Sequence, residues 1–429
     1  MRKKTEKLII YMISMTLITS FLIGSLSMVE IGNNSDEFSN SVSTSSTQDT
    51  FWPENSSEWI EVAPETQGLN SSKIAEMFEF IKDNSQDIHS IIVVRNGYLL
   101  VYEYLHNFEI YRYIDGSKTY FGGDNLHGQY STTKSFISIL IGIALQEGFL
   151  DNVNQTLYEF FAHRWSPSFI NSTLKKNITI EQLLTMTSGF GDYSVPDAHL
   201  KIDDDVISFI LDEVPLEYTP GENWTYSNEG VDLLSGIIAN VSGTSTEEFA
   251  KLYLFEPLGI SEDEYYWLND SIGMDYGGSG IECTPKVQAK IGMLALNNGS
   301  WDGKQIVDKD YMKDATTNQT SEGKWADYGY LWWIMNGSLE GYHSAGALGQ
   351  NIYVLPEYNI IVGFTGYYAE EVYEQIILDY ILQFVPEMGP DNPGIPGFDL
   401  NMILLMVLCT TAVLVIRMKK YSNKKKNEK

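Results

Sequence analysis

The sequence predicts an α+β fold in which strands from both ends of the folded body form one antiparallel sheet around an inserted helical region. Two hairpin signals frame this arrangement. The first is Asn96-Gly97 between two short apolar runs, 91–94 and 99–102, and Asn-Gly in this setting strongly favours a tight β-turn. The second is Pro356-Glu357, which separates the apolar runs 352–355 and 360–365.

Helical patterns lie between the two hairpins and after the second one. Two of them end at a glycine, Gly148 or Gly243, which is a typical helix stop. Strands near both ends with helices between them favour a single sheet into which a helical region is inserted. The predicted helices are 131–147, 180–186, 229–241 and 372–384.

The charge distribution excludes one class of partner. The chain of 429 residues carries a formal net charge of -29. Residues 1–30 and 400–429 hold 11 of the 28 basic and 3 of the 57 acidic residues, so 17 basic and 54 acidic residues remain between them, a net charge of -37. Such a surface repels phosphate backbones, so no nucleic-acid partner is expected.

Both ends carry signals for a membrane. An uncharged stretch follows basic residues near the N-terminus, so residues 1–30 are predicted to be a signal peptide or signal anchor. Residues 398–417 are predicted to form a transmembrane helix, and the basic tail 418–429 follows it. Because basic flanks stay in the cytoplasm, the body between the two segments is expected outside the cell.

The composition of the remaining chain defines the other boundaries. Residues 31–57 are rich in Ser, Thr and Asn and are predicted to be a flexible spacer. A Pro- and Gly-rich linker is predicted at 386–397, so the folded domain spans 58–385. The two cysteines, Cys283 and Cys409, predict neither a disulfide framework nor a metal site. No cofactor is expected, and the sequence does not indicate an oligomeric state.

Ser131 and Lys134 form the first candidate catalytic motif. The pattern Ser-x-x-Lys also occurs at 172–175, 321–324 and 422–425, but only Ser131 opens a helix that is apolar nearly all round and therefore buried. Positions i and i+3 share a helix face, which places the lysine amine beside the serine hydroxyl. Burial and the positive helix end both disfavour the ammonium form, so the amine is expected to accept the serine proton. The alternative is that Ser131 merely caps the helix and Lys134 lies on the surface.

Two further segments complete a candidate site. Tyr226-Ser227-Asn228 precedes an amphipathic helix, and a tyrosine there can relay protons while an asparagine can bind a substrate amide or carbonyl. The segment 343–350, His-Ser-Ala-Gly-Ala-Leu-Gly-Gln, has small residues whose backbone N–H groups can approach a ligand, as an oxyanion hole requires. In isolation, the first segment also fits a helix cap and the second a glycine-rich turn.

In this order the three motifs resemble the serine β-lactamase and penicillin-binding-protein superfamily, whose signature is Ser-x-x-Lys, Tyr-x-Asn and then Lys-Thr-Gly or His-x-Gly. Segments 183–189, 255–260 and 294–306 are similar to family segments as well. The chain looks most like class C β-lactamase-related esterases and 6-aminohexanoate-dimer hydrolases. The resemblance implies a β-lactamase-like fold and a serine hydrolase that forms an acyl-enzyme.

The resemblance also assigns roles to residues. Ser131 would be the nucleophile, Lys134 its base, Tyr226 the proton relay and Asn228 a substrate ligand, while the N–H groups of Ser131 and Ala347 would form the oxyanion hole. Where penicillin-recognising relatives carry a cation, this chain has Ser344, with His343 displaced by one position and Gly346 following. The lost cation predicts a neutral ester or amide substrate, since a carboxylate would lack its partner. The alternatives are a β-lactamase or D-Ala-D-Ala peptidase, and a catalytically silent surface binding protein on the same fold.

Overall fold

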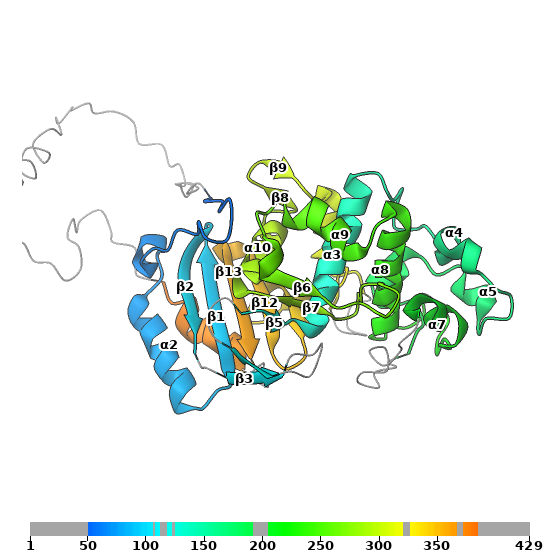
Figure 1. Ribbon diagram of the computed structural model, residues 1–429. Helices are drawn as coiled ribbons and strands as arrows, with labels where there is room; N and C mark the ends of the chain where they lie inside the picture. Colours follow the sequence, from blue (N-terminus) through cyan, green and yellow to red (C-terminus); the bar gives the residue numbers. More distant parts are fainter. Residues whose placement is uncertain are drawn as a thin grey trace, which may run out of the picture. The chain divides into compact units, whose positions relative to one another are not determined.

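The computed structural model describes residues 50–105, 108–111, 118–121, 125–191, 205–320, 327–366 and 372–384. Its main sheet has six strands in the order β10-β11-β12-β13-β1-β2, and every neighbouring pair is antiparallel (Figure 1). The strands are β1 Ile88–Arg95, β2 Tyr98–Tyr104, β10 Trp333–Asn336, β11 Glu340–Gly346, β12 Gln350–Leu355 and β13 Ile360–Gly366.

The two predicted hairpins are confirmed, and they lie side by side in the sheet, where β13 pairs with β1. Asn96 and Gly97 have φ of 51° and 79°, the left-handed pair that a tight hairpin turn requires. The second hairpin turns through a short 3₁₀ helix, Pro356–Tyr358. Strand β1 pairs with β13, with Val93 opposite Val362, so the sheet joins the two ends of the domain as predicted.

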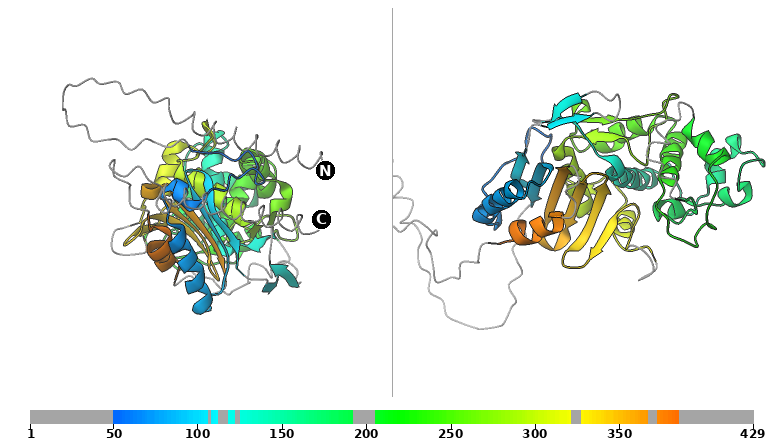
Figure 2. Two further views of the ribbon diagram at one scale, coloured as in Figure 1. Left: turned by 90° about the vertical axis from the view of Figure 1, so that its left-hand side faces the viewer. Right: turned by 90° about the horizontal axis from the view of Figure 1, so that it is seen from below.

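Helices cover both faces of the sheet (Figure 2). Helix α2, Ser71–Asp83, packs against the C-terminal helical segment, which consists of α12, Tyr373–Ile376, and a π-helical turn, Ile377–Ile381. They share an apolar core with one face of the sheet. On the opposite face, α10, Pro285–Leu296, contacts β12, β13 and β1. Because both faces are covered, β12 and β13 are buried along their whole length.

The helical region is inserted between the two halves of the sheet. Its centre is α3, Thr133–Gln146, which is buried from Thr133 to Ala144 and packs against α8, Asn228–Ser242. Gly148 and Gly243 follow these helices in the left-handed conformation, as the sequence predicted. The other helices are α4 Leu157–Phe161, α5 Ser172–Lys175, α6 Ile180–Leu184, α7 Val206–Asp212, α9 Thr246–Ala250 and α11 Lys309–Ala315.

Three small sheets complete the fold. One of them, β5-β7-β6, lies next to the residues that precede Ser131. The strands are β3 Phe108–Tyr111 with β4 Lys118–Phe121, β5 His127–Gly128 with β7 Ile281–Cys283 and β6 Tyr265–Trp267, and β8 Ser300–Trp301 with β9 Lys304–Gln305.

The predicted membrane segments, 1–30 and 398–417, lie outside the described residues, as do the linker 386–397, the tail 418–429 and residues 31–49 of the predicted spacer. In the part of the chain that the structure describes, no helix combines the length and the apolar character that crossing a bilayer requires.

Candidate active site

Ser131 lies in a short 3₁₀ turn, Tyr130–Thr132, that leads into α3. The sequence placed it in the first turn of that helix, and the regular α-helix begins two residues later. Tyr130 has φ of 48°, a left-handed conformation that costs free energy for a bulky residue and that clusters at functional sites. The Thr132 hydroxyl donates to the carbonyl oxygen of Gln350 at 2.8 Å. The turn that carries Ser131 is thereby attached to the start of β12.

Lys134 is the best-connected side chain of the site. It is only 2% exposed, and its Nζ lies 3.1 Å from Ser131 Oγ and 2.6 Å from Asn228 Oδ1. The Gly278 carbonyl oxygen is its third partner. A neutral amine can donate to the two carbonyl-type oxygens and accept from the hydroxyl, so this geometry suits a base for Ser131.

Asn228 and Tyr226 come from the segment that begins α8. Ser227 is the N-cap residue, and its hydroxyl accepts from Gly230 N at 3.2 Å. The Tyr226 side chain is therefore not needed for capping. The Nζ of Lys134 lies 4.8 Å from the centre of its ring. The structure thus brings Ser131, Lys134, Tyr226 and Asn228 together.

The segment 183–189 contacts the backbone around Tyr226. Met186 has a left-handed backbone, with φ of 58°. Its carbonyl oxygen accepts from Thr225 N at 2.8 Å, and its sulfur lies 3.4 Å from Ser227 N. Met186 therefore contacts the backbone on both sides of Tyr226, which explains how a segment distant in sequence contributes to the site.

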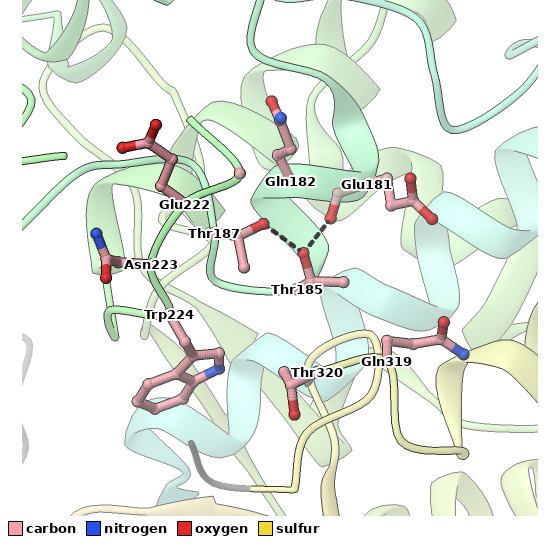
Figure 3. Close-up of a pocket in the computed structure, with 10 residues that line it drawn as sticks. Glu181, Gln182, Thr185, Thr187, Glu222, Asn223, Trp224, Gln319 and Thr320 are labelled. Atoms are coloured by element: carbon pink, nitrogen blue, oxygen red, sulfur yellow. Dashed lines mark hydrogen bonds between the residues drawn. The ribbon is translucent and has the colours of Figure 1, made fainter. Parts of the chain in front are cut away.

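A polar cleft of about 300 Å³ lies next to the Tyr226 segment (Figure 3). Trp224 lines the cleft, and its ring lies 6.5 Å from that of Tyr226 and 5.9 Å from that of Trp333. The Thr185 hydroxyl donates to the Glu181 carbonyl oxygen and bonds the Thr187 hydroxyl, each at 2.8 Å. The lining residues include two acids and no base: they are Glu181, Gln182, Thr185, Thr187, Gly221, Glu222, Asn223, Trp224, Gln319 and Thr320.

The third motif forms the end of β11 and the turn after it. A Cβ on Gly346 would lie 2.2 Å from the Gln129 carbonyl oxygen, so the strand approaches the chain just before Ser131 as only glycine permits. Ala347 follows directly and is exposed. Its position next to this close approach places its backbone near Ser131.

Ser344 and His343 lie on opposite faces of β11, because successive side chains of a strand alternate. Ser344 is 1% exposed and faces α3: its Oγ lies 3.4 Å from Thr132 Oγ1 and accepts from Ile352 N at 3.1 Å. The half-buried His343 ring stacks at 4.9 Å on Tyr353, which belongs to the core on the other face. Burial lowers the pKa of His343. His343 Nδ1 lies 3.2 Å from Asn351 Oδ1, and the assignment of His343 to the substrate-binding group stays a prediction.

Two residues near Lys134 carried no signal in the sequence. Gly278 supplies the carbonyl oxygen that Lys134 contacts. Asp232 is fully buried, and its Oδ1 accepts from Gly277 N at 2.8 Å and from Gly278 N at 2.9 Å. The run Gly277-Gly278-Ser279-Gly280 is the sequence feature that could have indicated close backbone packing here. Within the described residues, no three His, Cys, Asp or Glu side chains are grouped as a metal site would require.

The fold is an antiparallel sheet with an inserted helical region. A serine and a buried lysine at the start of α3, with a tyrosine from the segment before α8 beside them, define the β-lactamase-like class of serine hydrolases. The family model described as Beta-lactamase matches residues 89–366. The chain belongs to this family, and the predicted resemblance is confirmed.

Relatives within the family are distant. The chain is 29% identical over 197 residues to a penicillin-binding protein of Bacillus subtilis, an alignment that covers 44% of this chain and 40% of that protein. It is 22% identical over 262 residues to an uncharacterized protein of Alkalihalophilus pseudofirmus, covering 54% of this chain and 70% of the relative. The chain thus matches less than half the length of the Bacillus subtilis relative.

Solved structures share the fold. One described as a 6-aminohexanoate-dimer hydrolase from Bacillus anthracis superposes with a TM-score of 0.57 and 21% identity, covering 70% of this chain and 80% of the other. A family VIII carboxylesterase gives a TM-score of 0.54 and 16% identity, with coverage of 69% and 91%. At these identities the likeness concerns the fold alone.

Proposed function

We propose that this protein is a serine hydrolase that cleaves an ester or amide through an acyl-enzyme on Ser131. The observation that carries the proposal is the position of the Lys134 amine, 3.1 Å from Ser131 Oγ. Two further oxygens, from Asn228 and Gly278, hold the amine there. A silent binding protein would need no buried amine directed at a serine hydroxyl.

The proposed mechanism begins with proton transfer. The neutral Lys134 amine takes the proton of Ser131 as Oγ attacks the substrate carbonyl carbon. The N–H groups of Ser131 and Ala347 stabilise the negative charge that develops on the carbonyl oxygen. Tyr226 relays the proton from Lys134 to the departing alkoxide or amine, which leaves the acyl group on Ser131 and the Lys134 amine neutral again. Water then attacks the acyl carbon and gives one proton to Lys134. The carboxylic acid is released as that proton passes from Lys134 to Ser131 Oγ.

Asn228 has two parts in this scheme. Its Oδ1 accepts from Lys134 at 2.6 Å. The amide nitrogen keeps its two donors for a substrate carbonyl. Asn228 thereby links the position of the base to the position of the substrate.

The proposed substrate is neutral rather than anionic. Ser344 stands where relatives that bind carboxylates have a cation, and its hydroxyl is already bonded within the protein. The cleft beside Tyr226 adds Glu181 and Glu222, which repel an anion. The net charge of -37 between the two ends acts in the same direction. We further propose that the domain works at the outer face of the cell membrane, held there by the apolar segments at both ends.

The first test compares Ser131→Ala with the wild type in the hydrolysis of a neutral ester and in labelling by a fluorophosphonate probe. Ser131→Ala is expected to abolish both while the protein stays folded, since the hydroxyl contributes little packing. The matched control is Ser172→Ala, because Ser172 begins another Ser-x-x-Lys sequence and lies in α5. The control should keep full activity, whereas full activity in Ser131→Ala would refute the mechanism.

The second test addresses the substrate class. Rates are measured for a neutral ester, a neutral amide and a cephalosporin chromophore at neutral pH. A charge-assisted contact to a carboxylate contributes about 1.5 to 3 kcal/mol. Because this contact is absent, kcat/KM for the cephalosporin should be lower than for the neutral substrates by roughly one to two powers of ten. Rapid cephalosporin turnover would instead favour the β-lactamase alternative.

A further inference from the structure

We infer that Asp232 is a positioning residue, whose carboxylate fixes the backbone at Gly277 and Gly278 so that the Gly278 carbonyl holds the Lys134 amine beside Ser131. This inference deepens the proposed function and rests on it. Asp232 does not touch the substrate in this account and acts only through Gly278 and Lys134.

The carboxylate of Asp232 binds two successive backbone N–H groups with a single oxygen. Oδ1 accepts from Gly277 N at 2.8 Å and from Gly278 N at 2.9 Å. The other oxygen, Oδ2, is buried without a hydrogen-bond partner, and the side chain is fully buried. A buried carboxylate with an unpaired oxygen costs free energy, and such a group calls for an explanation beyond packing.

The two glycines lie directly on α8. A Cβ on Gly277 would lie 2.3 Å from the Val231 carbonyl oxygen, and one on Gly278 would lie 2.9 Å from Asn228 Cβ. Any larger residue would therefore push the loop away from the helix and move the Gly278 carbonyl. Close packing and the two hydrogen bonds to Asp232 together determine where that carbonyl points.

Helix α8 consequently positions Lys134 in two ways. Asn228, in the first turn of the helix, contacts the amine directly. Asp232 is four residues later, on the same helix face, and reaches the amine through the Gly278 backbone. A substitution at Asp232 should therefore affect the base even though the two side chains share no hydrogen bond.

The charge of Asp232 provides a way to detect this role. Burial raises the pKa of Asp232 to about 6, and Asp270 acts in the same direction, while the two backbone N–H donors oppose the rise. Above this pH the carboxylate makes charge-assisted hydrogen bonds to both N–H groups. Below it the protonated acid binds them more weakly, since hydrogen bonds to an ionised acceptor are about twice as strong. Asparagine at this position imitates the protonated form at every pH.

The test uses the full chain and the rate of fluorophosphonate labelling, in which a bond forms between Ser131 Oγ and phosphorus, fluoride leaves and the serine proton passes to Lys134. At pH 8, Asp232→Asn is expected to label about tenfold more slowly than the wild type, as the loss of roughly 1.4 kcal/mol of charge assistance implies. At pH 5 the two rates should be nearly equal. Circular dichroism at both pH values verifies that the compared proteins are folded.

Asp275→Asn is the matched control. Asp275 lies two residues before Gly277, is also buried and has a pKa that burial raises to about 6. Its carboxylate accepts from Glu247 N at 2.7 Å, away from Lys134. This variant should keep the wild-type labelling profile even if its melting temperature falls, because it removes a buried charge that does not reach the base.

Two results would overturn the inference: wild-type labelling by Asp232→Asn at pH 8, or the same pH-dependent loss in Asp275→Asn. Both leave the proposed function intact, since the wild type still labels at Ser131. Absence of labelling in the wild type would instead refute the proposed function itself.

Discussion

At the scale of single residues, the site depends on a buried lysine whose amine contacts three oxygen atoms. Lys134 contacts Ser131, Asn228 and Gly278. The chain contains a useful comparison, because Lys175 is also fully buried and also contacts two oxygens, the carbonyls of Ile210 and Leu211. The two lysines differ in the neighbouring hydroxyl: of the two, Lys134 has a serine hydroxyl 3.1 Å from its amine.

Replacing Lys134 and Lys175 in turn should have different effects on labelling. Lys134→Met should reduce the rate of fluorophosphonate labelling by about a hundredfold to ten-thousandfold, the usual contribution of a general base. Lys175→Met should lower the melting temperature, because two buried carbonyls lose their donor, but should label at the wild-type rate once folded. Equal labelling rates for the wild type and Lys134→Met would show that Lys134 is not the base for Ser131.

His127, four residues before Ser131, predicts sensitivity to acid. Its Nε2 lies 2.9 Å from His89 Nδ1, and burial together with His89 lowers the pKa of His127 to about 3. The unfolded chain binds a proton below about pH 6.5 and the folded protein does not. The contribution of uncharged His127 to the free energy of unfolding is therefore fully present above pH 6.5 and is lost progressively as the pH falls toward 3.

Urea unfolding between pH 7 and pH 4.5 measures this effect. His127 should contribute a loss of about 1.4 kcal/mol per pH unit below 6.5. In His127→Gln this contribution should disappear, whereas the exposed His163 offers a control whose replacement by Gln leaves the slope unchanged. An identical slope in wild type and His127→Gln would show that other groups cause the acid sensitivity.

At the scale of elements, the end of strand β11 must lie against the turn that carries Ser131. Gly346 makes this contact possible, since a Cβ there would lie 2.2 Å from the Gln129 carbonyl oxygen and 3.1 Å from Thr132 Oγ1. The oxyanion hole assigned to Ser131 and Ala347 needs the strand and the turn at this distance. The packing of this strand thus sets the geometry of the proposed oxyanion hole.

Gly346→Ala should therefore separate the strand from the turn. We expect a loss of about 1 to 3 kcal/mol in the free energy of unfolding from overpacking. We also expect roughly a hundredfold slower labelling, as displacements near 1 Å can cause. Gly337→Ala is the control, because a Cβ there meets nothing within 4 Å. Unchanged labelling in Gly346→Ala would show that the position of β11 does not affect the reaction at Ser131.

The elements also show what a sequence can predict. The two hairpins and the helices at 133–146 and 228–242 follow from local signals, such as Asn96-Gly97 and the glycines after each helix. The group of Ser131, Lys134, Tyr226 and Asn228 follows from motif order. The orientation of His343 does not, because it depends on the register of β11 against β12, where His343 opposes Tyr353. Asp232 could not be found either, since its partners are 45 and 46 residues away.

At the scale of the whole molecule, the fold brings together motifs that are far apart in the chain. Thr132, which follows Ser131, is hydrogen-bonded to Gln350 across 218 residues, and Lys134 to Gly278 across 144. The sheet supports both, because its neighbouring strands β1 and β13 join the two ends of the domain. A truncation that removes either end should therefore abolish the site as well as the sheet.

The proposed position in the cell makes a separate whole-molecule prediction. A reporter fused after Lys429 should be cytoplasmic, while protease added to intact cells should cleave or release the domain, because basic residues flank both apolar segments on one side. The control is the same protease treatment after cell lysis, which exposes the reporter too. Protection of the domain in intact cells would contradict the proposed topology.

The central claim is that Ser131 becomes acylated with Lys134 as its base. The most direct measurement treats the full chain with a fluorophosphonate or a neutral ester and maps the modified residue by peptide mass spectrometry. The account predicts a single covalent adduct on Ser131, reduced by at least about a hundredfold in rate in Lys134→Met. An adduct at any other serine, or an adduct on Ser131 that forms equally fast without Lys134, would contradict it.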